Sequence, residues 1–172
     1  MGRSFEAVFE SEFATLHRYL GRRVGPAAAD ELAAETFAVA FRSWDRLDPA
    51  RPVRPWLYGI VANLMRHHWR KERRMLHAYA RTGVDPVFAE DDEAVERADA
   101  DARHRELAAA LAGLRRDERE ILLLHAWAEL TDAEIADALD LPPGTVKSRL
   151  SRAREKLRNQ LGGVGQEPVE AS

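Results

Sequence analysis

Basic and hydroxyl side chains recur along residues 142–161 in a pattern that could bind the phosphates and base edges of DNA. This segment holds six Lys or Arg residues and a single acid. At 3.6 residues per turn, its apolar side chains fall within one narrow arc and its polar side chains point away from that arc. The apolar set is Val146, Leu150, Ala153, Leu157 and Leu161. The outward set is Lys147, Ser148, Ser151, Arg152 and Glu155, with Arg149, Arg154 and Lys156 on the flanks. A helix with this outward face suits insertion into a DNA major groove.

A short helix and a tight turn precede this basic helix. Thr131 and Glu134 have the spacing of a capping box, which marks the start of a helix. Residues 140–144 then bring two prolines and a glycine, which end one helix and begin the next. Residues 131–158 therefore predict a helix-turn-helix that binds DNA. The alternative is an ordinary helical hairpin with a solvated basic face.

A second basic segment lies in the first half of the chain. Residues 63–74 hold five Lys or Arg residues around Trp69, a combination that suits a nucleic-acid backbone and a stacked base. The alternative is a solvated helix end whose cations favour the helix dipole. His67 and His68 are adjacent, so on a helix they point about 100° apart. No carboxylate pair completes a site with them, and we predict no metal.

Charge is distributed unevenly along the 172 residues, a length that suits one ordinary domain or two small ones. The net charge is only −3, but residues 42–81 hold ten Lys or Arg and three acids. Residues 82–106 hold nine acids and three Arg. Two basic segments separated by an acidic one indicate two DNA-facing modules and a solvated connector.

Several function classes are disfavoured by what the sequence lacks. It has no cysteine, which excludes disulfides, a thiol nucleophile and Cys-ligated zinc, and suits a reducing cytoplasm. No apolar run approaches the roughly twenty residues that span a membrane, and the N-terminus has no signal-peptide pattern. There is no Gly-rich phosphate loop or nucleophile elbow. We therefore expect a cytoplasmic protein with no catalytic residue, cofactor, small-molecule substrate or membrane insertion.

Helical periodicity runs through nearly the whole chain, with Ser4 as an expected N-cap and a break at Gly25-Pro26. Pro55 is expected to begin a third helix that ends near Arg74. The pattern predicts an all-α protein of two small helical domains joined by a flexible acidic linker. The predicted segments are 1–78, the linker 79–102, 103–161 and a flexible tail 162–172.

Three motifs also resemble those of a known family. Residues 144–154, preceded by Glu134-Ile-Ala, resemble region 4 of bacterial sigma factors, the segment that reads promoters. Residues 55–63 and the basic run after them resemble sigma regions 2.3 and 2.4, and residues 30–37 resemble region 2.2. With the motifs in this order, the chain resembles a small two-domain sigma factor of the extracytoplasmic-function group of the sigma-70 family. The resemblance covers about residues 5–78 and 103–160.

This resemblance implies a sigma region 2 bundle and a region 4 helix-turn-helix. It implies an alternative sigma factor, not an enzyme, that binds core RNA polymerase and directs promoter-specific transcription initiation. It implies two kinds of promoter DNA as partners, the duplex minus-thirty-five element and the non-template single strand of the minus-ten element. An anti-sigma protein wedged between the two domains is a further implied partner.

The resemblance also assigns roles at matching positions. The minus-thirty-five set is Lys147, Ser148, Arg149, Ser151, Arg152 and Arg154. The minus-ten set is Arg51, Arg54, Asn63, Arg66, His67, Trp69, Arg70, Arg73 and Arg74, and the loop 47–54 takes a flipped-out base. The polymerase-binding set is Asp30, Glu31, Ala34, Glu35 and Phe37. Ala34 stands where the family typically has glutamine, so one polar contact to polymerase is expected to be missing.

Two other functions compete with this interpretation. A helix-turn-helix transcriptional regulator with an N-terminal sensing domain would bind operators without polymerase. A nucleic-acid-processing enzyme would need a metal site or an acid–base pair, and the sequence offers neither. Association with core polymerase and transcription in vitro separate the three.

Overall fold

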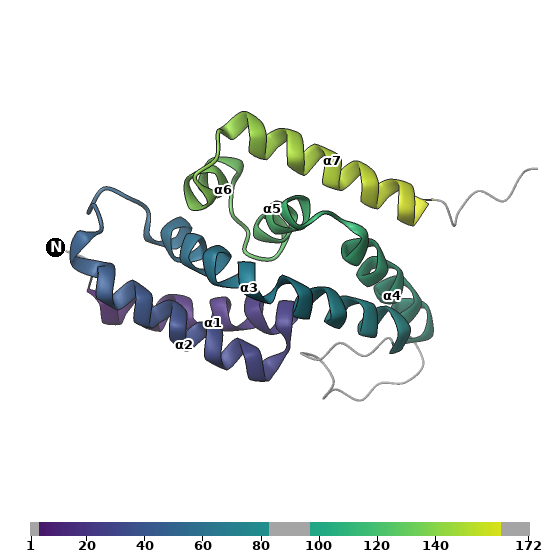
Figure 1. The fold of residues 1–172 in the computed structure, drawn as a ribbon, viewed down its shortest axis with the longest axis horizontal. Coiled ribbons are helices and arrows are strands. Elements are labelled where there is room, and N and C mark those ends of the chain that lie inside the picture. The colour runs from purple at the N-terminus through teal and green to yellow at the C-terminus, as the bar shows by residue number, and fades with distance from the viewer. Residues whose placement is uncertain (1–3, 83–96, 163–172) are drawn as a thin grey trace, which may run out of the picture.

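The computed structural model describes residues 4–82 and 97–162, and all regular secondary structure within these ranges is helical (Figure 1). This confirms the all-α prediction. The elements are α1 (Phe5–Val24), α2 (Pro26–Ser43), the 3-10 turn η1 (Trp44–Arg46), α3 (Val53–Thr82), α4 (Arg97–Gly113), α5 (Arg116–Ala126), α6 (Asp132–Leu139) and α7 (Pro143–Leu161).

The first module is formed by α1, α2 and α3. Ser4 caps α1 as predicted, because its hydroxyl accepts a hydrogen bond from the Ala7 amide at 3.2 Å. Gly25 separates α1 from α2 with a φ of 86°, a backbone conformation that favours glycine. The core of this module includes Leu16, Leu20 and Leu57, each fully buried.

The third helix is longer than the sequence predicted. It begins at Val53, two residues before Pro55, and continues to Thr82 instead of ending near Arg74. The extension has a packing reason, since Leu76 is buried and Tyr79 packs against the core. The expected connector 79–102 is therefore helical at both ends, because α4 already begins at Arg97. The rest of that connector, residues 83–96, and most of the predicted tail lie outside the described residues.

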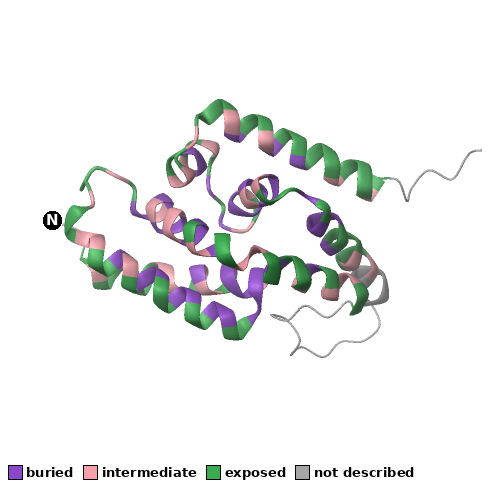
Figure 2. Ribbon diagram, in the orientation of Figure 1, coloured by how far each residue is buried: buried purple, intermediate pink, exposed green. Residues whose placement is uncertain are grey.

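The second module is formed by α4, α5, α6 and α7. Thr131 and Glu134 make the predicted capping box: the Thr131 amide donates to Glu134 at 2.8 Å, and the Glu134 amide donates to the Thr131 hydroxyl at 3.3 Å. Figure 2 shows α7 buried only along the side that faces α5 and α6. That side carries Val146, Leu150 and Ala153, which confirms the predicted apolar arc.

The two modules pack directly against each other. α3 contacts α4, α5 and α6, so the helix that ends the first module runs along the second (Figure 1). Among the described residues, no helix combines the length and apolar character needed to cross a membrane.

Candidate nucleic-acid interface

The outward face of α7 carries most of the residues predicted to read duplex DNA. Five of the six are exposed: Lys147, Ser148, Ser151, Arg152 and Arg154. Two of them are linked along the helix, since Arg152 Nε donates to the Ser148 carbonyl at 3.3 Å. The exposed face can reach base edges and phosphates, in agreement with the helix-turn-helix prediction.

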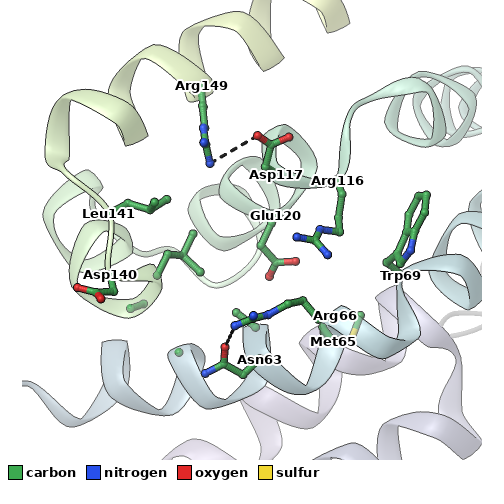
Figure 3. A pocket seen from close by; sticks show the side chains of 14 residues that line it. Asn63, Met65, Arg66, Trp69, Arg116, Asp117, Glu120, Asp140, Leu141 and Arg149 are labelled. Carbon is green, nitrogen blue, oxygen red and sulfur yellow. Dashed lines mark hydrogen bonds and ion pairs between the residues drawn. The ribbon is translucent and has the colours of Figure 1, made fainter.

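Arg149, the sixth residue of that set, points elsewhere. Its side chain is half-buried, and Nη1 lies 3.5 Å from Asp117 Oδ2 on α5. Figure 3 shows the guanidinium directed from α7 toward the space between the modules. In this arrangement Arg149 connects α7 to α5 and does not share the outward face.

Lys156, on the flank of α7, pairs with a buried carboxylate of α5. Its ammonium donates to both carboxylate oxygens of Glu118, at 2.9 and 2.7 Å, and the Glu118 side chain is almost fully buried. A buried carboxylate is costly to leave unpaired, so the pair holds α7 against α5.

The seven residues from Asn63 to Arg74 that are predicted to bind the minus-ten strand divide into two groups. His67, Arg70, Arg73 and Arg74 are exposed along the C-terminal half of α3, where they could contact a nucleic-acid backbone. Asn63, Arg66 and Trp69 line a pocket of about 470 Å³ between the modules, in which Asn63 and Arg66 are still exposed. Figure 3 shows these three side chains facing Arg116 and Glu120 of α5, and Arg66 donates to Asn63 within the pocket.

The loop predicted to take a flipped base is bound to the second module. Arg51 donates to the Asp137 carboxylate at 3.1 and 3.2 Å, and also to the Asp137 carbonyl at 3.1 Å. Arg54 donates to the Ala128 carbonyl at 2.8 Å. Both arginines therefore contact protein at the positions where the sequence predicted DNA.

The predicted polymerase-binding residues lie on α2. Asp30, Glu31, Ala34 and Glu35 are exposed on one face of this helix, and Asp30 Oδ1 lies 2.7 Å from His17 Nε2. Phe37 differs, because it is buried against the rings of Phe9 and Phe13. Phe37 can support the surface by packing but does not present its ring to a partner.

Four charged residues that sequence reasoning did not single out form a largely buried cluster between the modules. Arg23 Nε donates to Glu72 at 2.6 Å, and its two terminal nitrogens donate to the two oxygens of Glu120, each at 2.7 Å. Arg119 donates to the other Glu72 oxygen at 3.1 and 3.2 Å. We call this set of Arg23, Glu72, Arg119 and Glu120 the charge quartet.

Three residues of the charge quartet are buried, and the fourth, Glu120, has a side chain that is 15% exposed. Arg23, Glu72 and Arg119 are at most 2% exposed. Burial alone would lower the pKa of Arg23, but Glu120 and Glu72 raise that pKa well above its ordinary value. Burial raises the pKa of Tyr19, whose hydroxyl accepts from Arg23 at 2.7 Å.

The sequence offered one indication of this buried cluster. Glu72 is the single acid in the run 66–74 and shares a helix face with Met65 and Leu76.

The described residues contain no group of three or more His, Asp or Glu placed to hold a metal ion. In particular, His67 and His77 are exposed on α3.

Two family models match the chain in separate segments. The model of sigma-70 region 2 matches residues 8–75, and that of sigma-70 region 4 matches residues 104–157. The extracytoplasmic-function sigma factor EcfG of Rhodopseudomonas palustris is 33% identical over 129 residues, which are 75% of this chain and 68% of EcfG. The sigma factor CarQ of Myxococcus xanthus is 32% identical over 161 residues, which are 92% of this chain and 90% of CarQ.

Two solved structures share the fold. CnrH, in complex with the cytosolic domain of CnrY, has a TM-score of 0.67 and 26% identity, and the match covers 92% of this chain and 88% of CnrH. The sigma factor RpoE of Bartonella quintana, in complex with the anti-sigma factor NepR, has a TM-score of 0.65 at 22% identity. That match covers 94% of this chain and 98% of RpoE, and at this identity it supports the fold alone.

Proposed function

We propose residue-level roles for this chain on the premise that it belongs to the extracytoplasmic-function group of the sigma-70 family of RNA polymerase sigma factors. The chain is an alternative sigma factor that directs promoter-specific transcription initiation. The observation that carries this conclusion is the presence of both promoter-binding regions, in family order, on two helical modules of one chain. In this role the protein performs no covalent chemistry itself and works in the cytoplasm beside the polymerase.

The second module is proposed to read the minus-thirty-five element as duplex. The exposed donors on α7 support this role, with Lys147 and Arg152 as candidates for base edges and Arg154 for phosphate. Of the six residues in the set, Arg149 is the least suited to contact DNA, because its guanidinium already pairs with Asp117.

The first module is proposed to bind the non-template strand of the minus-ten element. Extruding a base from a duplex costs a few kcal/mol, which a pocket that hydrogen-bonds the base edge can offset. Asn63 and the loop 47–54 are proposed to supply that pocket. The exposed arginines after Trp69 would hold the adjacent backbone.

The exposed face of α2 is proposed to bind core polymerase. It presents three carboxylates, Asp30, Glu31 and Glu35, around Ala34, which offers no polar group. The segments proposed to carry these functions are 1–78 and 103–161, connected by 79–102 and followed by a tail from 162.

An anti-sigma protein is proposed to regulate this chain. The support is the solved structure of CnrH, a relative of 26% identity that is in complex with the cytosolic domain of CnrY. A protein wedged between the two modules would have to displace the contacts that α3 makes with α5 and α6. A one-to-one complex that leaves polymerase binding intact would contradict this mode of inhibition.

The proposed function is tested by association with core polymerase. The chain should co-elute with core enzyme in gel filtration, and the complex should then retain promoter DNA. A double substitution, Asp30→Ala with Glu35→Ala, should reduce co-elution, while the exposed residue Glu10 of α1 gives the matched control, Glu10→Ala. Tight binding to promoter DNA without any association with core enzyme would instead favour the operator-binding regulator.

A further inference from the structure

We propose that the segment 163–172 docks back along α7, in a groove beside three cations, and there competes with DNA for Lys147 and Arg154. The competition rests on the minus-thirty-five role proposed above. The docking can be measured without any DNA, so the two ideas can fail separately. Residues 163–172 themselves lie outside the part of the chain that the structure describes.

The groove has a volume of about 1030 Å³ and runs along α7 from the start of α6 to the end of α7. Leu150, Leu157 and Leu161 form its apolar floor, since spacings of seven and four place them on one stripe of the helix. Leu150 is buried, whereas Leu157 and Leu161 are half-buried and keep apolar surface that a short segment could cover. Among the described residues that line the groove, one is an acid: Asp132, which lies 3.9 Å from His125.

Three cations stand beside this apolar stripe. Lys147, Arg154 and Arg158 are exposed, and none of them has an acid partner among residues 4–82 and 97–162. By contrast, Arg149 and Lys156 of the same helix already pair with carboxylates of α5. The groove therefore suits an occupant that is both acidic and partly apolar.

The segment that follows α7 has this composition. It holds two glutamates, two valines and no cation. It also begins at the groove, because Gly162 lines one end of the groove and residue 163 comes next. The tether gives the segment a local concentration that a free acidic partner would not reach, and this favours it as the occupant.

The segment is long enough to reach all three cations. From Gly162 back to Lys147 the helix rises about 22 Å, at 1.5 Å per residue. Ten extended residues span about 33 Å, so a chain that reverses at Gly163 can place Glu167 near Arg154 or Arg158. Glu170, eight positions after Gly162, can extend about 26 Å and reach Lys147.

Docking in this groove would affect DNA binding directly. Lys147 and Arg154 belong to the set proposed to read the minus-thirty-five element, so the segment must leave them before DNA can use them. Exposed ion pairs are individually weak, and the tether offsets only part of that weakness. The effect is therefore a moderate competition that DNA can overcome and not a complete block.

The main test locates the segment by paramagnetic broadening of amide signals in the full chain. The protein has no cysteine, so Ser172→Cys can carry the only spin label. If the segment docks, broadening should be strongest at residues 147–151, far from the point of attachment. Broadening that fades steadily from Leu161 toward Lys147 is what an undocked tether gives, and it would overturn the proposal.

A mixed sample shows whether the contact lies within one chain. Isotope-labelled protein without the spin label is combined with spin-labelled protein that carries no isotope. The proposal expects no broadening at residues 147–151 in this sample. Broadening there would overturn it, because the groove would then hold the segment of a second copy.

Substitutions on the two sides of the contact should weaken the docking. Glu167→Gln with Glu170→Gln removes both charges of the segment, and Arg158→Gln removes a cation that has no proposed role in DNA reading. Both variants should lose most of the broadening at residues 147–151. The matched controls are Glu6→Gln with Glu10→Gln and Arg18→Gln, exposed positions of α1 that make the same changes of charge, and both should keep it.

Competition is measured with a mixed-sequence duplex of about twenty base pairs at low salt. A chain that ends at Gly162 should bind this duplex on the order of fivefold more tightly than the parent chain. Glu167→Gln with Glu170→Gln should give part of that gain, and the α1 control pair should give less. If the label shows docking but the shortened chain binds the duplex no more tightly, the competition is overturned and Lys147 and Arg154 are not the DNA contacts proposed above.

Discussion

The guanidinium of Arg23 holds the carboxylate of Glu120 through two hydrogen bonds of 2.7 Å, across 97 positions of sequence. This pair joins the end of α1 to the middle of α5, so the two modules share one buried set of charges. Their folding should be coupled for the same reason.

The coupling predicts how the chain unfolds in urea. The parent protein should lose its helices in one transition, whereas Glu120→Gln should weaken the contact by about 1.5–3 kcal/mol and split the transition into two. Tryptophan fluorescence and circular dichroism, followed together, would resolve the two modules.

The exposed pair of Arg51 and Asp137 offers a comparison at the same interface. Both side chains are more than one third exposed, so Asp137→Asn should cost no more than about 1 kcal/mol and keep a single transition. A single transition with an unchanged midpoint in Glu120→Gln would show that the modules are not coupled through this pair.

A second prediction concerns the recognition helix. Lys147→Ala and Arg152→Ala should each weaken binding to the minus-thirty-five duplex by about 1–3 kcal/mol if their side chains read base edges. Arg154→Ala should weaken cognate and scrambled duplexes alike if its contact is to phosphate. The control is Asn159→Ala, an exposed position one to two turns further along α7. Equal losses on both duplexes for every variant would contradict the assignment of base readers.

A third prediction concerns the minus-ten strand. Asn63→Ala should change which base is preferred in that element, because the amide can both donate to and accept from a base edge. Co-elution with core polymerase should be unchanged, since the exposed face of α2 lies elsewhere. Transcription from templates that differ at single minus-ten positions measures the preference. Loss of polymerase binding with an unchanged base preference would show that Asn63 contacts polymerase and does not read the minus-ten strand.

A fourth prediction concerns the start of α6. Thr131→Ala removes the hydroxyl that accepts from the Glu134 amide and should cost about 1 kcal/mol of stability. Thr131→Ser keeps the hydroxyl and should cost much less. Denaturant unfolding of the three proteins is the measurement, and equal losses in both variants would show that the cap does not stabilise the helix-turn-helix.

The sequence predicted correctly those features that depend on the residue spacing within a single helix. The arc of Val146, Leu150 and Ala153 and the capping box at Thr131 depend only on helical spacing, and both are confirmed. The end of α3 was predicted too early, because Leu76 and Tyr79 remain helical through packing with distant residues.

The contact between the modules could not be predicted from local patterns. Arg23 and Glu120 lie 97 positions apart, and each reads as an ordinary charge on a helix until the fold brings them together. Gly59 gave no signal for the same reason, since a Cβ at this position would lie 2.6 Å from the Ala138 carbonyl oxygen across the interface. Only the position of Glu72 on the apolar face of α3 pointed to a buried partner.

The central claim is that this chain gives RNA polymerase its promoter choice. The most direct measurement is sequencing of transcripts made by core polymerase from a library randomised at the minus-ten and minus-thirty-five positions. With the protein present, transcripts should be enriched for one pair of short elements, and core enzyme alone should show no such enrichment. If the protein binds DNA from this library but transcripts show no enrichment in its presence, the claim is contradicted.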